Sequence, residues 1–234
     1  MIISSSAIVL SKLKYRDNDL IIKLFVRELG LTSFIVRGGS KKNKINYFQQ
    51  LSLLEIEFDF NSKRNLHYFK DFESKCNLKT IHTDFKKMGV IIFLSEVLSK
   101  ILIHQQKDYH LYDFIEDAIK YYDQHVFSSK FHIVFLMNLS KFLGFYPDIN
   151  NNDYQYFDLQ HGFYSQTKDS DYIIFDDDLE CFNKILGINF DDLSTLTLTL
   201  VQRKKLLDNI ILYYRLHTEN FVSVKSLEVL RKLF

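Results

Sequence analysis

The residues best suited to chemistry form one short basic run, Arg37-Gly38-Gly39-Ser40-Lys41-Lys42-Asn43-Lys44. Its cations can neutralise phosphates, and its two glycines let the backbone approach a phosphate closely. A single surface lysine is usually only solvated, but as a group this run indicates contact with a nucleic acid. We expect further nucleic-acid contacts from basic residues elsewhere in the first third of the chain: Lys12, Lys14, Arg16, Lys63 and Arg64.

The same region carries aromatic side chains between its basic residues. Small barrels that bind single strands combine a cationic groove with aromatic rings on which bases stack. We expect Phe34 and Phe48 to pack in the core instead. Stacking on bases is assigned to three remaining candidates: Tyr47, His67 and Tyr68.

Evidence for catalysis is weak. The pair of acidic runs, Asp176-Asp177-Asp178 and Asp191-Asp192, could bind a metal ion. Acidic residues also stabilise the first turn of a helix, and we favour that interpretation. The sequence has no P-loop, GxGxxG, HExxH or GxSxG motif. Cys76 and Cys181 lie 105 positions apart, without metal-ligand spacing. We therefore expect no enzyme, no metal and no cofactor; a hydrolase or transferase that uses the aspartates is a remaining alternative.

The formal net charge of +1 conceals a division along the chain. Residues 1–80 contain 14 Lys or Arg and 8 Asp or Glu, a net charge of +6. Residues 81–234 contain 16 Lys or Arg and 21 Asp or Glu, a net charge of −5. A basic first third on an otherwise acidic protein is typical of a chain in which one domain meets a polyanion.

The secondary structure that must position these residues is predicted to change from strands to helices near residue 80. Before it, five short hydrophobic or alternating segments predict strands: 7–13, 20–26, 31–36, 50–60 and 66–72. In the fourth segment, Leu54, Ile56, Phe58 and Phe60 share the parity that we place inward. Five strands with short turns predict a small closed barrel over residues 1–80, either an OB-fold or an SH3-like barrel.

Residues 81–234 have mainly helical periodicity. Helices are predicted from residue 83, over 108–123, 129–143 and 177–186, after a capping box at Thr199–Gln202, and over about 224–233. One small hairpin is expected near 154–165. The fold class is thus α+β: a five-stranded barrel domain over 1–80, followed by a mostly helical domain over 81–234 with a hairpin insertion.

Several local patterns, in order, resemble the RecO family of recombination mediators. Ala7-Ile8-Val9-Leu10 resembles the first strand of that family, and Val36-Arg37-Gly38 with the basic loop resembles its strand-to-loop signature. Leu143-Gly144-Phe145-Tyr146-Pro147-Asp148 is similar to its helix-ending segment, and Val224-Lys225-Ser226-Leu227 to part of its C-terminal region. The resemblance covers nearly the whole chain, and it implies an OB-fold for the barrel.

The resemblance also implies a function and partners. A RecO-like protein binds single- and double-stranded DNA, can anneal strands, and with RecR helps RecA load onto strands coated by single-strand-binding protein. The acidic, Phe-terminated tail of that coating protein would dock on the helical domain. An apolar pocket with a cationic rim would suit the tail, and we assign the rim to Arg203, Lys204, Lys205 and Arg215.

One departure from the family concerns zinc. Many RecO proteins bind zinc through four cysteines around the hairpin, whereas residues 150–168 contain no cysteine and only one histidine, His161. We expect no zinc there. Packing of aromatic side chains is expected to replace it: Tyr154, Tyr156, Phe157, Phe163 and Tyr164.

The sequence also indicates where the protein is located. The sequence shows no signal peptide and no apolar run long enough for a membrane span. Together with the two unpaired cysteines, this predicts a cytoplasmic protein, and the resemblance implies association with the bacterial nucleoid.

An OB-type RNA-binding or translation-associated module is the alternative function, because stacking platforms do not distinguish sugars.

Overall fold

The computed structural model describes residues 1–104, 106–219 and 221–233; the side chains of Lys42, Asn43 and His104 lie outside this description. Two compact units make up the chain. The first contains Met1–Phe127 and Val224–Leu233, and the second contains Ser128–Ser223. The first unit therefore includes helices as well as the barrel. The predicted domain limits, 1–80 and 81–234, stay a prediction.

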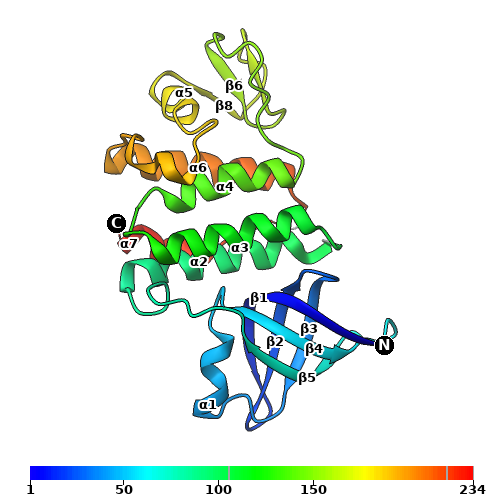
Figure 1. Cartoon of the computed structure of the whole chain (residues 1–234). Coiled ribbons are helices and arrows are strands. Elements are labelled where there is room, and N and C mark those ends of the chain that lie inside the picture. The colour runs from blue at the N-terminus through cyan, green and yellow to red at the C-terminus, as the bar shows by residue number, and fades with distance from the viewer. Residues whose placement is uncertain (105, 220, 234) are drawn as a thin grey trace. The chain divides into compact units, whose positions relative to one another are not determined.

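The first unit begins with a closed five-stranded barrel (Figure 1). Its strands are β1 (Ile2–Tyr15), β2 (Asp19–Val26), β3 (Gly30–Val36), β4 (Leu53–Asp59) and β5 (His67–Ser74). The order around the barrel is β1-β2-β3-β5-β4, with β4 pairing back onto β1. Every pair is antiparallel except β3 with β5. This arrangement confirms the predicted OB-fold.

Strand alternation fills the barrel core. Leu54, Ile56 and Phe58 are buried, as their shared parity predicts, and Phe60 is partly buried against the same core. Phe34 is buried among them, as expected. This cluster fixes which face of each strand points outward, because a strand presents successive side chains to opposite faces.

Between β3 and β4 the chain forms a short helix, α1 (Lys42–Ile45), and a 3₁₀ turn, η1 (Asn46–Phe48). Composition predicts a loop for residues 37–44, and its last three residues are helical instead. The reason is the pair Ile45 and Phe48, three positions apart, which both pack on the barrel core. Burying this pair stabilises a helical turn that the polar residues before it would not favour alone.

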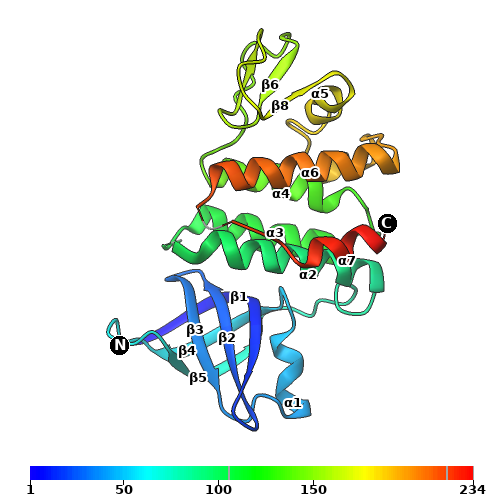
Figure 2. The ribbon, with the colours of Figure 1, turned by 180° about the vertical axis from the view of Figure 1, so that it is seen from behind.

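Three helices complete the first unit: α2 (Phe85–Ile101), α3 (Tyr109–Gln124) and α7 (Ser226–Leu233), with a 3₁₀ turn, η2 (Leu102–His104), after α2. Asp84 and Asp108 accept backbone hydrogen bonds at the starts of α2 and α3. The Ser95 hydroxyl in α2 donates to the Leu10 carbonyl of β1. Although α7 ends the chain, it lies beside α2 (Figure 2).

The second unit contains α4 (Phe131–Phe142), α5 (Asp176–Asn183), a 3₁₀ turn η3 (Phe190–Ser194) and α6 (Leu200–His217), with a small sheet. The predicted capping box is present: Thr199 and Gln202 exchange hydrogen bonds at the start of α6. The predicted hairpin is also present, as β6 (Tyr156–Asp158) and β7 (Phe163–Ser165). A third strand, β8 (Ile173–Phe175), pairs with β6 and was not predicted.

Candidate nucleic-acid interface

A cation and an exposed aromatic ring meet where β3 lies beside β5. The parallel register sets Ile35 opposite Tyr68, whose side chain is 44% exposed. The Arg37 guanidinium, one residue beyond β3, lies 5.3 Å from the centroid of the Tyr68 ring. This pair offers a base-stacking surface and a phosphate-binding group at one point.

The outer face of β2 and β3 continues this surface. Ile21 is opposite Ile35 and Lys23 is opposite Ser33, so all four share the outward parity, and Lys23 is exposed. In OB-folds this face, with the β1–β2 and β4–β5 turns, is where oligonucleotides bind. Lys23 is one of the basic residues in the first third of the chain, and its outward parity between the buried Ile22 and Leu24 places it on this face.

The two turns that border this face both carry exposed cations. Arg16 in the β1–β2 turn has a positive φ of 54° and its guanidinium lies 5.2 Å from the Tyr15 ring centroid. In the β4–β5 turn, the Asn61 side chain accepts the Lys63 backbone N–H at 3.0 Å, and the Asn61 carbonyl accepts that of Arg64. These turns hold Arg16, Lys63 and Arg64 at the edges of the candidate surface.

The basic run after β3 leads away from this face along α1. Gly38 has a φ of +62° and donates its N–H to Asp19 at 2.9 Å. A Cβ on Gly39 would lie 3.0 Å from Val36. Turn geometry and close packing therefore explain both glycines without any phosphate. Lys41 and Lys44 are exposed, while the Lys42 side chain lies outside the described residues.

Four of the predicted contact residues do not lie on the candidate face: His67, Lys12, Lys14 and Tyr47. His67 is only 4% exposed and packs against Phe34 and Phe60, so it cannot offer a ring face to a base. It points inward because it shares the parity of Phe69, while Tyr68 between them points outward. Burial lowers the pKa of His67, which is consistent with a neutral core residue. We therefore leave His67 out of the proposed interface.

Lys12 and Lys14 project from the other side of β1. Their register partners are Ile22 and Leu20, which are buried, so both lysines have the inward parity at the end of the strand. Lys12 is partly buried, and this burial lowers its pKa. Lys14 is exposed but does not share the face of Lys23. Tyr47 is 37% exposed on η1, beyond the basic run rather than on the sheet face.

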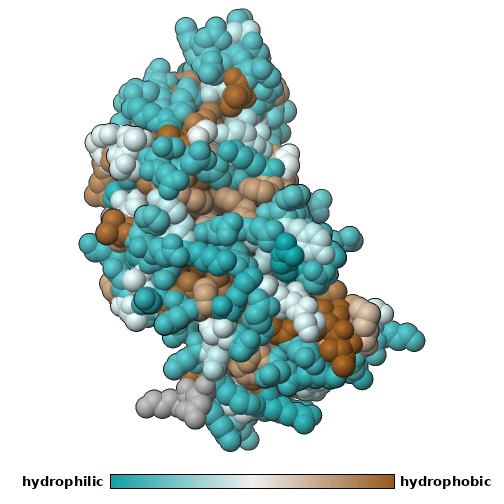
Figure 3. Space-filling model, viewed as in Figure 1, coloured by the Kyte–Doolittle hydropathy of each residue, from teal (hydrophilic) through white to brown (hydrophobic). Residues whose placement is uncertain are grey.

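The outer face of β4 and β5 has the opposite charge. Glu57 lies opposite Asp71 and Glu55 opposite Glu73, which places like charges directly across the two strands. The barrel surface in the view of Figure 3 is largely hydrophilic, with apolar side chains near the N-terminus, where Ile2 is exposed. A polyanion is repelled from the β4–β5 face and attracted to the β2–β3 side.

In the second unit, the four cations assigned to a rim do not converge. Arg203 donates to the Ser129 hydroxyl at 2.5 Å, and Lys205 pairs with Asp178 at 2.7 Å. On α6, these two residues point about 160° apart, because successive residues of a helix are rotated by about 100° around its axis. Lys204 and Arg215 are exposed, and their spacing of eleven residues returns them to nearly the same side of α6.

The acidic runs take the structural role that we favoured. Asp176, Asp177 and Asp178 lie in the first turn of α5, and Asp191 with Asp192 in that of η3. Within residues 1–104, 106–219 and 221–233, no group of three or more His, Cys, Asp or Glu side chains is placed to bind a metal ion. None of the helices in these residues has the length and hydrophobicity of a membrane span.

The hairpin is packed mainly by two of the five aromatic residues expected there. Phe157 and Tyr164 are buried, and the Phe157 ring lies 4.8 Å from that of Phe182. Phe163 is exposed, which contradicts its expected packing role, because it has the opposite parity to Tyr164. His161, the only candidate zinc ligand of the region, hydrogen-bonds Asp158 at 2.8 Å instead.

Known proteins resemble the chain along its whole length. The family model described as "Recombination protein O N terminal" matches residues 1–76, and "Recombination protein O C terminal" matches residues 82–228. The DNA repair protein RecO of Flavobacterium psychrophilum and that of Flavobacterium johnsoniae are each 36% identical over 238 residues. That of Porphyromonas gingivalis is 31% identical over 254 residues. In all three comparisons, 100% of both chains is covered.

Proposed function

We propose, because the chain belongs to the RecO family of DNA repair proteins, that its barrel binds single- and double-stranded DNA. The observation that carries the proposal is the pairing of Arg37 with the exposed Tyr68, with Lys23 on the same outer face of the β2–β3 side. Phosphates bind the cations, bases stack on Tyr68, and the acidic β4–β5 face directs the strand to one side.

Annealing follows from the same chemistry without an active site. Two strands repel each other through their phosphates, and cations that neutralise both strands lower that barrier. The protein would act as a mediator rather than an enzyme, in keeping with the first-turn positions of Asp176 in α5 and Asp191 in η3. With RecR, it would help RecA replace single-strand-binding protein on the strand.

For the tail of single-strand-binding protein, α6 is the proposed contact. Lys204 and Arg215 are exposed cations on one side of that helix, and the exposed Val201 lies one turn before Lys204. An acidic peptide that ends in Phe needs this combination of positive charge and apolar surface. A fluorescent peptide of that composition should bind the wild type and lose affinity for Lys204→Ala; unchanged affinity would exclude this helix face.

DNA binding is tested by fluorescence anisotropy of a labelled single strand across a salt series. The double variant Arg37→Ala/Lys44→Ala should bind more weakly, and its slope of log K against log salt should fall by about 0.7 for each phosphate contact that is lost. Lys184→Ala/Lys232→Ala removes the same charge outside the barrel and serves as the control.

Three outcomes contradict the proposal. They are a wild type that binds no DNA at low salt, a control variant that loses as much affinity as the barrel variant, and a matched RNA strand that displaces DNA at much lower concentration. The last result would favour an RNA-binding module, because backbone neutralisation alone does not select the sugar.

A further inference from the structure

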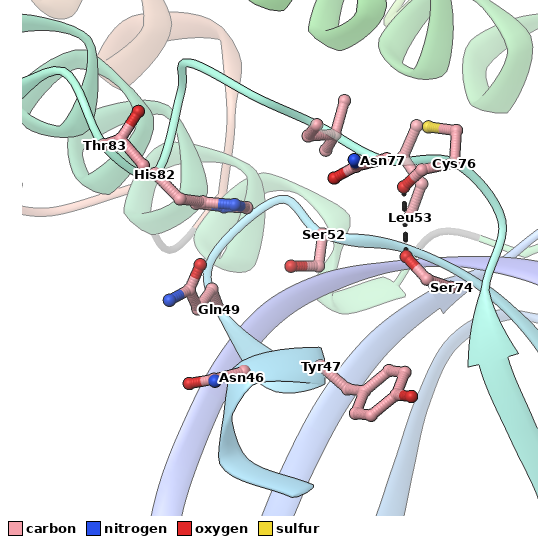
Figure 4. Close-up of a pocket in the computed structure, with 11 residues that line it drawn as sticks. Asn46, Tyr47, Gln49, Ser52, Leu53, Ser74, Cys76, Asn77, His82 and Thr83 are labelled. Carbon is pink, nitrogen blue, oxygen red and sulfur yellow. Dashed lines mark hydrogen bonds between the residues drawn. The ribbon is translucent and has the colours of Figure 1, made fainter. Parts of the chain in front are cut away.

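A pocket of about 390 Å³ lies beside the barrel, within the first unit. Figure 4 shows its two sides. Asn46, Tyr47 and Gln49 line it from η1 and the following turn, and Asn77 and His82 line it from the segment that joins β5 to α2. The volume lies within the range of about 300–1,000 Å³ in which small molecules bind.

The lining of this pocket is polar but uncharged. No Lys, Arg, Asp or Glu is among its lining residues. Burial lowers the pKa of His82, whose Nε2 lies 2.8 Å from the Gln50 carbonyl and donates to it in the neutral form. Burial raises the pKa of the Cys76 thiol, which favours its protonated state. A phosphate group or a metal ion would therefore gain no charged partner here.

Three carboxamides in this lining have hydrogen-bonding capacity to spare. Within the part of the chain that the structure describes, the side chains of Asn46, Gln49 and Asn77 make no hydrogen bond. Each carboxamide offers a donor and an acceptor side by side. The edge of a nucleobase presents the complementary arrangement, and unstacked bases are read through such contacts.

An aromatic ring completes the chemistry of a base-binding site. The Tyr47 ring is 37% exposed, and its centroid lies 5.5 Å from that of Phe72 in an edge-to-face contact. The contact with Phe72 fixes the ring, so that stacking a base on it costs little conformational entropy.

The backbone around the pocket is held by the barrel. Val9 donates its N–H to the Ser52 carbonyl at 2.9 Å, and Leu51 donates to the Val9 carbonyl at 2.7 Å. Lys75 donates to the Leu53 carbonyl at 2.9 Å. The pocket is therefore preformed, and a ligand does not have to order it.

From these observations we propose that the pocket accepts one base turned out of a bound DNA strand. This inference rests on the proposed function and adds a base-binding subsite to it. Lys41 and Lys44 lead along α1 from Arg37 to the pocket, and Lys79 directly follows the lining residue Leu78. The phosphates follow these cations while the base enters the neutral pocket. Single strands suit the site best, because their bases are already unpaired.

The first test uses the absence of tryptophan from the chain. Tyr47→Trp introduces a single tryptophan in the pocket, and Tyr172→Trp introduces a single tryptophan on the second unit as a control. Each variant is titrated with a single-stranded oligonucleotide and with an abasic strand of equal length. We expect the base-bearing strand alone to quench the tryptophan at position 47. Equal quenching by both strands, or none while anisotropy shows binding, overturns the pocket and leaves the proposed function intact.

The second test measures affinity by anisotropy in Gln49→Ala/Asn77→Ala, with Gln124→Ala, an exposed carboxamide at the end of α3, as the control. Loss of the base contacts should weaken binding of the base-bearing strand about tenfold and leave binding of the abasic strand and its salt dependence unchanged. Equal affinities for the variant and the wild type overturn the proposal. If neither strand binds the wild type, the proposed function fails, and the base subsite fails with it.

Discussion

The carboxylate of Glu96 should control whether α7 stays attached to α2. It accepts the backbone N–H groups of Lys225 at 2.9 Å and Ser226 at 2.8 Å, and the Ser226 hydroxyl at 2.6 Å. Lys100 pairs with the same carboxylate at 2.9 Å. The first N–H groups of a helix have no partner within the helix and form its positive end. Glu96 thus caps α7 from a helix 130 residues earlier in the chain.

The strength of this cap can be judged from the pKa of Glu96. Burial raises this pKa, but the hydrogen bonds from Ser226, Lys100 and Lys225 outweigh it and lower the pKa from 4.5 to about 2. That difference corresponds to about 3 kcal/mol in favour of the charged, capped state. Because the folded pKa is depressed, this stabilisation is fully present above pH 4.5 and is lost as the pH falls towards 2.

We therefore expect Glu96→Gln to weaken the attachment of α7 by about 1–3 kcal/mol near neutral pH, since glutamine keeps one acceptor but no charge. Hydrogen exchange of the α7 amides measures this locally, and it should accelerate by about five- to 150-fold. Glu228→Gln, which neutralises an exposed carboxylate on α7 itself, is the control.

The pH dependence of hydrogen exchange in α7 shows whether the negative charge of Glu96 attaches this helix. The difference in exchange between wild type and Glu96→Gln should shrink as the pH falls from 4.5 towards 2. Equal protection of the two proteins at neutral pH would refute the cap. A difference that does not change with pH would show that shape, rather than the carboxylate charge, attaches α7.

Two further substitutions test buried contacts. Lys87→Met should lower the free energy of unfolding by about 2–4 kcal/mol, because the buried ammonium donates to three carbonyls at the end of α3; chemical denaturation checks this against the exposed Lys86→Met. Gly162→Ala should lower the thermal midpoint more than Gly187→Ala. Both glycines have a φ of +76°, but only at Gly162 would a Cβ meet a neighbour, the Tyr213 hydroxyl at 2.8 Å. Equal midpoints would show that backbone strain alone decides.

Local pattern was sufficient for much of the fold. The alternation of Leu54, Ile56 and Phe58 identified a strand and its inward face, and both were confirmed. The same rule, applied to His67 and Tyr68, would have separated the buried residue from the exposed one. The prediction that His67 stacks on bases rested on its residue type and not on its parity, and its burial leaves no ring face for a base. For strand residues, parity is thus a better guide to exposure than side-chain chemistry.

Long-range contacts could not be read from the sequence. Glu96 and Ser226 meet across 130 positions, and no local period links them. The pocket likewise joins two separate segments that contain Tyr47 and Asn77. Each segment alone looks like a polar loop, and only closure of the barrel brings the two together. Such sites depend on topology, which hydrophobic periodicity does not encode.

The same hydrogen bonds hold the segment beside the pocket and the end of α3. Asp123 of α3 accepts the backbone N–H groups of Lys79, Thr80 and Ile81 at 2.7–3.0 Å, and Lys87 donates to the Thr80 hydroxyl at 2.7 Å. Lys79, Thr80 and Ile81 lie in the sequence between the pocket-lining residues Asn77 and His82. Loss of the Lys87 ammonium should therefore loosen the pocket that we propose for a base as well as the end of α3. If Lys87→Met lowers stability but leaves base-dependent quenching in Tyr47→Trp unchanged, the pocket is supported by the barrel alone.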